Sequence, residues 1–286
     1  MRLGHLGPAG TFTEQAARAA ADAAGAELVP YATIRDVADA VLVGDVERGL
    51  VPIENSLEGT VNATVDALSA EDGLAIVGEQ VLGVTQCLIA REAIAPGDVR
   101  TVYSHPQGLA QCAGFLREEM PEATLVPTSS TAEAVRDLAQ APPDSAAIGA
   151  RFAAEAHGAI VLLEGIEDER GNETRFVWLA RAQGADEAFP PPAADARWKT
   201  SVLFAGPGDD SPGWLVRCLS EFAFRGVNLV RIESRPARRR LGHYVFLVDC
   251  EGRTDAPRVA EAVAGLGSHC DRVRVLGSYP AAARAS

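Results

Sequence analysis

Short apolar runs alternate with amphipathic stretches over the first third of the chain. The apolar runs predict strands at residues 3–6, 29–31 and 50–53. The stretches between and after them predict helices at residues 12–24, 34–43 and about 61–68, and the patterns Thr11-x-x-Glu14 and Thr33-x-x-Asp36 are typical starts for the first two. Strands that alternate with helices at this spacing indicate a largely parallel sheet.

A β-rich run at residues 75–90 interrupts this order, and we interpret it as the crossing into a second lobe. The same alternation then returns, with strands expected at 101–103, 124–126, 146–148 and 160–163 and helices at 107–119, 131–139 and 150–156. An apolar run at 176–180 leads back to the first lobe. Two α/β lobes joined by two crossings enclose a cleft, which is the layout of type II periplasmic binding proteins. Lobe 1 would span about 1–75 and 172–182, and lobe 2 about 76–171.

The last third of the chain has a different pattern. Residues 183–198 contain Pro190-Pro191-Pro192 among small and acidic residues, a linker composition. Residues 199–280 predict strands at 200–205, 227–234, 244–249 and 272–276 and helices at 213–224 and 256–266, with a basic turn at 238–240. That βαββαβ order is ferredoxin-like.

Composition narrows the class of protein. With 286 residues, 47% apolar and 23% charged, the chain is long enough for two globular domains. A net charge of −13 argues against nucleic acid or an anionic membrane as partner, although a few local Arg residues could still hold a small anion. The five scattered Cys residues favour a reduced, cytoplasmic setting without disulfides or a zinc site. No stretch approaches the roughly 18 apolar residues of a spanning helix.

Four polar loops follow predicted strands or begin predicted helices, at residues 10–14, 54–60, 104–107 and 129–133. Three have a simple structural interpretation, in which Thr11 is an N-cap, His105 precedes a Pro-initiated helix, and the hydroxyls of residues 129–131 cap the next helix. The loop at 54–60 carries more polar groups than a capped turn requires, and both interpretations stay open there.

A fifth polar segment, Gly171-Asn172-Glu173-Thr174-Arg175-Phe176, lies where a tight turn enters a buried strand. Arg binds carboxylates through two parallel hydrogen bonds, and Thr offers one donor and two acceptor lone pairs. Alone the segment is weak, because such a triplet is usually a strand start with a solvated Arg.

The chain contains no nucleophile elbow, zinc-protease, Walker or dinucleotide-binding pattern, and its His residues lack metal-ligand spacing. A cleft built from hydroxyls, amides and Arg suits a small polyanion that is bound without a cofactor or metal.

Taken together, residues 7–14, 51–59, 104–107 and 171–176 resemble the prephenate dehydratase family, in the family's order and over nearly the whole chain. The last domain resembles the ACT regulatory domain and carries Ile232-Glu233-Ser234-Arg235-Pro236. No chorismate mutase segment precedes these motifs, so we expect the monofunctional form.

The resemblance implies that the chain removes water and CO₂ from prephenate to give phenylpyruvate, on the route to phenylalanine. Thr174 would donate a hydrogen bond to the departing hydroxyl, Arg175 would hold a carboxylate, and Phe176 would shield the ring carboxylate from water. We prefer a hydrogen-bonding role for Thr174 because its hydroxyl is a poor full proton donor. The resemblance also assigns the substrate pocket to Thr11, Phe12, Asn55, Ser56, Glu58, His105, Gln107, Ser129, Ser130 and Thr131.

An ACT domain implies feedback control by phenylalanine, bound between chains of a homodimer or homotetramer. The matching positions are Gly213, Trp214, Leu215, Val216, Asn228, Leu229, Glu233, Ser234, Arg235 and Pro236. The family's usual Gly-Ala-Leu is Gly213-Trp214-Leu215 here, and this Trp could shrink the effector pocket or pack at its rim.

Two other functions stay open. Arogenate dehydratase uses the same chemistry on the amino-acid analogue, and the motifs do not separate the two substrates. A non-catalytic amino-acid sensor would share the architecture of binding proteins. A transcriptional regulator with an ACT domain is disfavoured because the chain has no basic helix-turn-helix segment.

Overall fold

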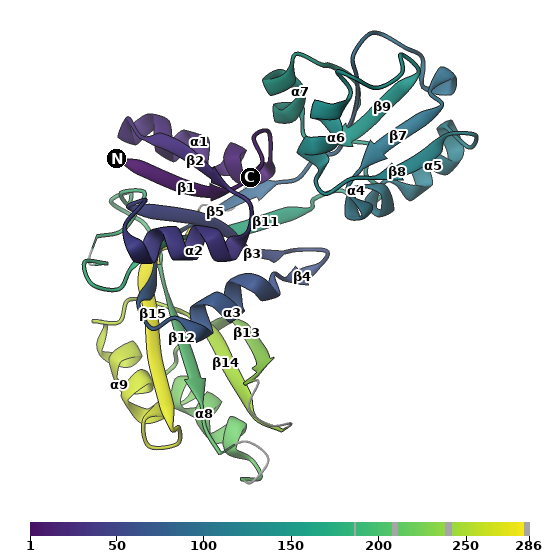
Figure 1. Cartoon of the computed structure of the whole chain (residues 1–286). Coiled ribbons are helices and arrows are strands. Elements are labelled where there is room, and N and C mark those ends of the chain that lie inside the picture. Colours follow the sequence, from purple (N-terminus) through teal and green to yellow (C-terminus); the bar gives the residue numbers. More distant parts are fainter. Residues whose placement is uncertain (186, 208–210, 238–241, 283–286) are drawn as a thin grey trace.

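The computed structural model describes residues 1–185, 187–207, 211–237 and 242–282. The predicted basic turn at residues 238–240 lies outside the described residues. Three sheets, each with its own helices, make up three parts of the chain (Figure 1). No described helix has the length and apolar character needed to span a membrane.

The first sheet has the order β2-β1-β3-β11-β5, with β4 paired to β3. Its strands are β1 (Arg2–Leu6), β2 (Glu27–Tyr31), β3 (Arg48–Asn55), β4 (Gly59–Thr60), β5 (Leu74–Gly83) and β11 (Glu173–Arg181). β1 runs parallel to β2 and β3, whereas β11 runs antiparallel to β3 and β5. The sheet is therefore mixed, not largely parallel.

Because β5 belongs to this sheet, residues 76–83 lie in the first part of the chain. Residues 76–83 were predicted to lie in the second lobe, because an apolar run does not reveal which strand it pairs with. The crossing begins after Gly83 and leads to β6 (Cys87–Ala90).

Three helices cover the first sheet: α1 (Phe12–Ala24), α2 (Ile34–Val43) and α3 (Asn62–Ala70). Thr11 and Thr33 cap the first two as predicted, and Thr33 forms a full capping box with Asp36. Alternate residues of β11 divide between the two faces, since Phe176 and Trp178 pack against the cluster under α1 while Val177 and Leu179 pack on the side of α2 and α3.

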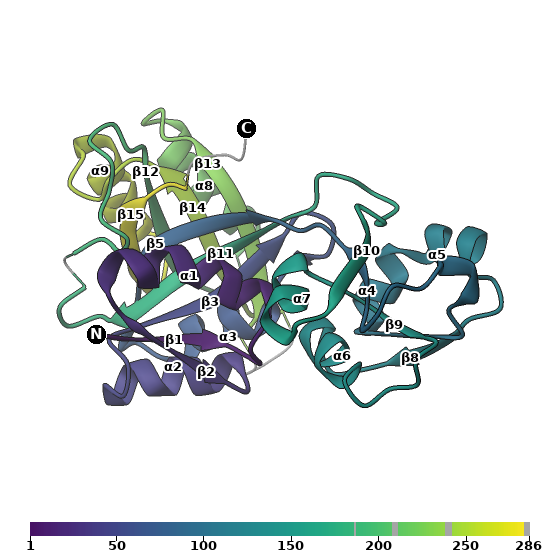
Figure 2. The ribbon, with the colours of Figure 1, turned by 90° about the horizontal axis from the view of Figure 1, so that it is seen from above.

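The second sheet has the order β10-β6-β9-β7-β8. Besides β6, its strands are β7 (Thr101–Ser104), β8 (Thr124–Pro127), β9 (Ser145–Gly149) and β10 (Ile160–Glu164); its helices are the short 3₁₀ turn η1 (Pro96–Asp98), α4 (Pro106–Gln111), α5 (Ala113–Glu119), α6 (Thr131–Asp137) and α7 (Arg151–His157). Seen from above, this part lies to one side of the first sheet and joins it through the segments before β6 and after β10 (Figure 2).

The single helix predicted at 107–119 is two helices, broken at Cys112. The reason is distant in sequence, because the carboxylate of Asp168 accepts hydrogen bonds from the backbone N–H groups of Gly114, at 2.8 Å, and Phe115, at 3.3 Å. Asp168 thus caps a new helix start that local sequence does not mark.

The third sheet has the order β13-β14-β12-β15, and all its neighbouring strands are antiparallel. Its elements are β12 (Trp198–Ala205), α8 (Trp214–Ala223), β13 (Leu229–Pro236), β14 (Tyr244–Glu251), α9 (Pro257–Leu266) and β15 (Arg272–Pro280). This is the βαββαβ order that the sequence predicted. Both helices pack on one face of the sheet.

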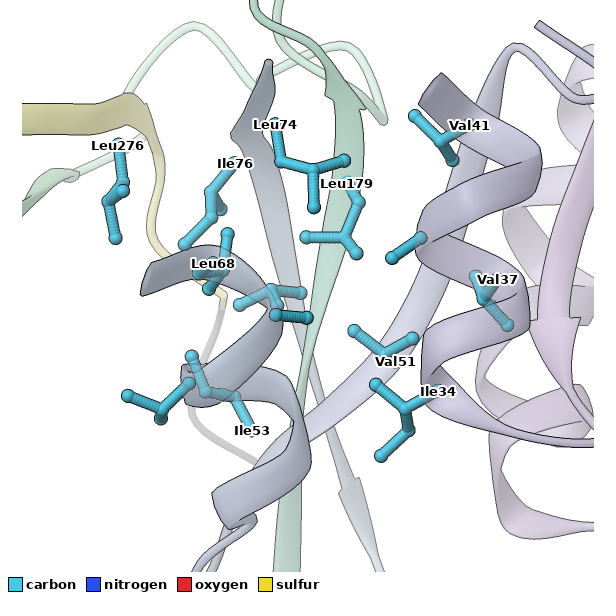
Figure 3. Close-up of a cluster of buried hydrophobic side chains, with 14 of the residues drawn as sticks. Ile34, Val37, Val41, Val51, Ile53, Leu68, Leu74, Ile76, Leu179 and Leu276 are labelled. Carbon is cyan, nitrogen blue, oxygen red and sulfur yellow. The ribbon is translucent and has the colours of Figure 1, made fainter. Parts of the chain in front are cut away.

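The other face of the third sheet packs against the first part of the chain. Leu203, Leu247 and Leu276 belong to the same buried cluster as Ile53 and Ile76 (Figure 3). The approach is close, because a Cβ atom at Gly277 of β15 would lie 1.9 Å from the carbonyl oxygen of Ile76 on β5. The first and third sheets therefore share one core.

Candidate active site

The carboxyl ends of β1 and β3 and the amino end of β11 meet at one edge of the first sheet, because β11 runs antiparallel to β3. Thr174 of β11 pairs directly with Asn55 of β3, and the turn after Leu6 of β1 leads to Thr11. Loops at such an edge commonly bind ligands. The sheet thus brings two of the predicted polar segments, 54–60 and 171–176, into contact, and the third, 10–14, follows a strand that runs toward the same edge.

The side-chain amide of Asn55 fixes the orientation of the Thr174 hydroxyl. Asn55 Oδ1 accepts hydrogen bonds from the backbone N–H groups of Leu57 and Glu58, both at 3.0 Å. Its Nδ2 must therefore donate, to Thr174 Oγ1 at 2.9 Å and to Asn172 Oδ1 at 2.8 Å. Thr174 Oγ1 is an acceptor in this contact, and within the described residues its own hydrogen meets no acceptor. The hydroxyl is thus ready to donate to a ligand.

Ser56 and Asn172 hold the two loops together. Ser56 Oγ donates to Asn172 Oδ1 at 3.3 Å and accepts from the backbone N–H of Glu173 at 2.9 Å. Glu58 is exposed, and only its backbone takes part in the Asn55 contact. Sequence reasoning missed Asn172 because the pair Gly171-Asn172 was interpreted only as a turn; the density of amides around Thr174 was the available signal.

The Thr11 hydroxyl is mainly structural. It donates to the carbonyl of Leu6 at 3.1 Å and accepts from the backbone N–H of Glu14 at 3.3 Å. The carboxylate of Glu14 itself occupies the backbone N–H of Gly10, at 2.8 Å. The carboxylate of Glu14 thus occupies the place at the helix N-terminus where the sequence suggested a ligand carboxylate. Phe12 is half-buried against the cluster under α1.

The polar loops of the second sheet are also helix caps. His105 Nδ1 accepts from the backbone N–H of Gln107 at 3.2 Å, and Ser130 Oγ accepts from that of Glu133 at 3.0 Å. Ser129 donates its hydroxyl to Glu133, whereas the Gln107 side chain is exposed. The capping interpretations of both loops are therefore confirmed.

These loops nevertheless lie close to one another and to the first sheet. A Cβ atom at Gly108 would lie 3.3 Å from Thr131 Cγ2, which places the loop at 104–107 beside the start of α6. Gly10, with its φ of +86°, approaches α6 and α7, because a Cβ there would lie 3.4 Å from Ala153 and 3.5 Å from Ala132. The turn before Thr11 thus touches the part of the second lobe that carries Thr131.

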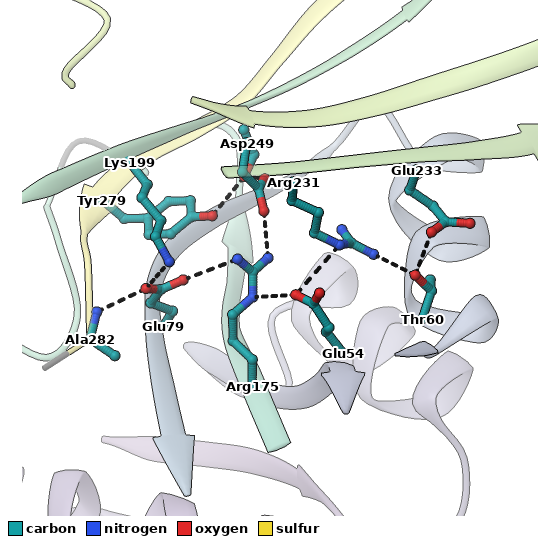
Figure 4. A network of polar contacts seen from close by, with 11 residues as sticks. Glu54, Thr60, Glu79, Arg175, Lys199, Arg231, Glu233, Asp249, Tyr279 and Ala282 are labelled. Carbon is teal, nitrogen blue, oxygen red and sulfur yellow. Dashed lines mark hydrogen bonds and ion pairs between the residues drawn. The ribbon is translucent and has the colours of Figure 1, made fainter. Parts of the chain in front are cut away.

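The position of Arg175 does not fit its predicted role of holding a substrate carboxylate. Its side chain is 9% exposed and points toward the third sheet (Figure 4). Because neighbouring residues of a strand face opposite sides, this is the face opposite Thr174. There Nη2 donates to Asp249 Oδ2 at 2.6 Å, Nη1 lies 3.5 Å from Glu79, and Nε lies 3.6 Å from Glu54. Burial by itself would lower the pKa of Arg175, but Asp249 and Glu79 raise it, so the guanidinium stays charged. Three protein carboxylates therefore surround the group that was expected to hold a substrate carboxylate.

The position of Phe176 does not fit its predicted role of shielding the ring carboxylate from water. The residue is 1% exposed and lies in the core under α1. Its side chain is on the same face of β11 as that of Thr174, but it lies two residues further along the strand, where helix α1 covers it. It cannot shield a ligand carboxylate from water.

A cavity of about 760 Å³ lies on the face toward the third sheet. Arg175, Glu79 and Lys199 line it together with Trp198, whose ring lies 4.2 Å below the guanidinium of Arg253. Ser56 and Glu173 also line the cavity, so it reaches the loops beside Thr174.

The predicted effector residues fall into two groups. Register places Arg235 beside Val245 and Val245 beside Ala205, so residues 233–236 and the start of α8 at 213–216 lie at one end of the third sheet. Leu229 pairs with Cys250, so Asn228 and Leu229 lie at the other end, about 20 Å away at roughly 3.3 Å per residue.

Several effector side chains are engaged within the chain. Trp214 is buried, donates from Nε1 to the carbonyl of His269 at 2.5 Å, and packs on Phe204 and Phe246. Its ring thus belongs to the core between the third sheet and its two helices. Arg235 donates to both carboxylate oxygens of Asp66 at 3.1 Å.

Comparisons with known proteins agree on one family. A family model described as prephenate dehydratase matches residues 3–184. The curated prephenate dehydratase of Amycolatopsis methanolica is 40% identical over 278 residues, covering 97% of this chain and 88% of that protein. A crystal structure of prephenate dehydratase in complex with L-Phe, from Arthrobacter aurescens, is 38% identical with a TM-score of 0.87, covering 98% of this chain and 90% of that one.

A further solved structure, described as GqqA, a novel type of quorum quenching acylase, is 30% identical with a TM-score of 0.84 and covers 98% of both chains. One fold can carry different activities, so the assignment depends on the family model and the sequence relatives more than on shape. On that basis the chain belongs to the prephenate dehydratase family.

Proposed function

We propose that this chain converts prephenate to phenylpyruvate, with loss of water and CO₂, at the sheet edge that carries Thr174. The observation that carries the proposal is the hydrogen-bond arrangement at Thr174. Asn55 donates to Thr174 Oγ1, and the Thr174 hydrogen is left free to donate to the hydroxyl that leaves the substrate ring. Donation from Asn55 polarises the Thr174 O–H bond and makes it a better donor.

The reaction itself needs little more than positioning. Loss of the ring hydroxyl and of CO₂ makes the ring aromatic, which drives the reaction forward. A fixed donor at the departing oxygen lowers the barrier because it stabilises charge that develops only in the transition state. Since Arg175 points to the opposite face and Phe176 is buried under α1, substrate carboxylates would be held by the loops at 104–107 and 129–131 of the second lobe.

The two α/β lobes would then close on the substrate as in type II periplasmic binding proteins. In support, the two sheets are linked by two crossings, and Gly10 already touches α6 and α7. We place lobe 1 at residues 1–83 and 172–182 and lobe 2 at 84–171, with a linker at 183–197. The setting would be the cytoplasm.

Residues 198–280 would form an ACT domain that binds phenylalanine between chains. Its βαββαβ order and the L-Phe complex of the Arthrobacter aurescens relative support this. Because Asn228 lies at one end of the sheet in one chain and Pro236 with the start of α8 at the other, a site that contains both groups needs a second chain. We therefore propose a homodimer or homotetramer joined through this domain.

The test is formation of phenylpyruvate from purified protein and prephenate, with arogenate as the competing substrate and phenylalanine as added effector. Faster turnover of prephenate than of arogenate supports the proposal, and the reverse order identifies an arogenate dehydratase. Turnover of neither substrate by folded protein would leave the amino-acid sensor as the better explanation. Indifference to phenylalanine, together with no binding in calorimetry, would refute the effector proposal alone.

A further inference from the structure

A buried ion-pair cluster on the reverse face of β11 joins the catalytic region to the C-terminal domain (Figure 4). It contains three anions and three cations, so its charges balance: Glu54, Glu79, Asp249, Arg175, Lys199 and Arg231. Three of these side chains come from the first sheet and three from the third. The chemistry proposed above makes no use of this cluster.

The shortest ion pair to Arg175 is the one with Asp249, at 2.6 Å against 3.5 Å to Glu79 and 3.6 Å to Glu54. Asp249 is fully buried, and its other oxygen accepts from Ser201 Oγ at 2.5 Å. Ser201 Oγ in turn lies 2.6 Å from the hydroxyl of Tyr279. Burial would raise the pKa of Asp249, yet the charge of Arg175 and the hydrogen bond from Ser201 hold it below its usual value. A charged carboxylate fixed in the third sheet thus holds Arg175.

Arg175 follows Thr174 directly in the chain, and the sheet is irregular at this place. Thr174 pairs with Asn55 and Arg175 with Glu54, but the register to β3 shifts before Phe176. The extra residue is Ile53 of β3, next to Glu54 and Asn55, whereas β11 keeps a regular register with β5 from Glu173 to Trp178. Because a bulged strand bends and twists locally, the contact of Arg175 with Glu54 bears on how Asn55 meets Thr174. A side-chain anchor on Arg175 therefore helps to set how Thr174 projects from the opposite face.

We propose that Asp249 is a positioning residue for the dehydration and acts through Arg175 on the placement of Thr174. The C-terminal domain then supplies part of the active-site geometry. This inference rests on the proposed function, because it concerns the step assigned to Thr174. Without the charge of Asp249, three cations, of which Arg175 and Arg231 are buried, face two anions, and Arg175 must move toward Glu79 and Glu54.

The test is the steady-state kinetics of Asp249→Asn, which keeps the side-chain shape and an acceptor for Ser201 but removes the charge. Because a displacement below 1 Å is enough to slow a positioned reaction, we expect kcat to fall roughly tenfold or more. The KM for prephenate should stay within about twofold, since no substrate contact changes. Tyr279→Phe is the matched control, because it removes a hydroxyl from the same buried chain but keeps the ion pair. Its kcat should stay within about twofold of wild type.

A double variant separates action through Arg175 from a direct effect. Arg175→Gln combined with Asp249→Asn should have the same kcat as Arg175→Gln alone. Unchanged kcat in folded Asp249→Asn, a change in KM only, or an equal kcat loss in Tyr279→Phe at a matched Tm would overturn the inference.

If Asp249→Asn does not fold, Ser201→Ala carries the same expectation with a smaller fall in kcat, and an unchanged kcat there overturns it too. A wild-type protein that does not form phenylpyruvate would instead refute the proposed function.

Discussion

The hydrogen bond from Asn55 to Thr174 can be reversed by exchanging one amide nitrogen for oxygen. In Asn55→Asp, one carboxylate oxygen would still accept from the backbone N–H groups of Leu57 and Glu58. The other would stand where Nδ2 now donates to Thr174 and Asn172. Because a carboxylate only accepts, the Thr174 hydroxyl must turn and donate to it, away from the substrate.

The size of the effect follows from that new bond. A hydrogen bond to a charged acceptor stabilises by about 1.5–3 kcal/mol, and it must be broken before Thr174 can donate to the leaving hydroxyl. At about 1.4 kcal/mol per tenfold in rate, kcat should fall roughly 10- to 150-fold. The KM should change less, because Asn55 is buried and offers little surface to the substrate.

The assay is initial-rate formation of phenylpyruvate, with circular dichroism to confirm the fold. Asn62→Asp is the matched control, because it adds the same charge at an exposed position in the first turn of α3, away from Thr174. It should keep wild-type kcat. A folded Asn55→Asp with wild-type kcat, or an equal loss in both variants, would refute the reasoning about the direction of this bond.

Two further expectations concern buried titratable groups. Burial lowers the pKa of His5 below its ordinary value of 6.5, so the unfolded chain binds the proton more tightly and stability falls as the pH drops below that value. In urea unfolding, the free energy of unfolding of His5→Gln should therefore depend less on pH than that of wild type between about pH 6.5 and 5. The difference in slope should be at most about 1.4 kcal/mol per pH unit, and an unchanged slope would contradict this. Burial also raises the pKa of Cys87 and Cys250 to about 11 and that of Cys112 to about 12. At about pH 8, an aromatic disulfide reagent should modify none of these three Cys residues in the folded protein and all of them after unfolding, as mapped by mass spectrometry. Rapid modification of the native protein would contradict this and show that the thiols are accessible.

Most helices and strands could be predicted because the residues that start and end them, such as helix caps, lie within or next to the element itself. The capping box of Thr33 and Asp36 is contained within four residues, and the helix begins where it predicts. The break at Cys112 could not be predicted in this way, because the carboxylate that causes it belongs to Asp168. The placement of β5 failed for a similar reason, since its partner β11 lies about 90 residues further along the chain.

The polar loops could be found from sequence, but the direction of their side chains could not. Thr174, Asn55 and Ser56 meet as expected because strand ends at one sheet edge are neighbours. Arg175 was misassigned because its partner Asp249 is 74 residues away, on a strand of the third sheet. Neighbouring residues of a strand face opposite sides of the sheet, so strand alternation alone predicts that Arg175 and Thr174 do not line the same site. The resemblance to the family motif led us to group them.

The most direct measurement of the central claim is the kcat of Thr174→Val beside that of Thr174→Ser, in folded protein with prephenate. Val keeps the shape of Thr without its hydroxyl, whereas Ser keeps the hydroxyl. If the Thr174 hydroxyl stabilises the departing group, Thr174→Val should lose roughly 100-fold or more in kcat, while Thr174→Ser stays within about tenfold of wild type. Turnover by Thr174→Val close to that of wild type would contradict the account.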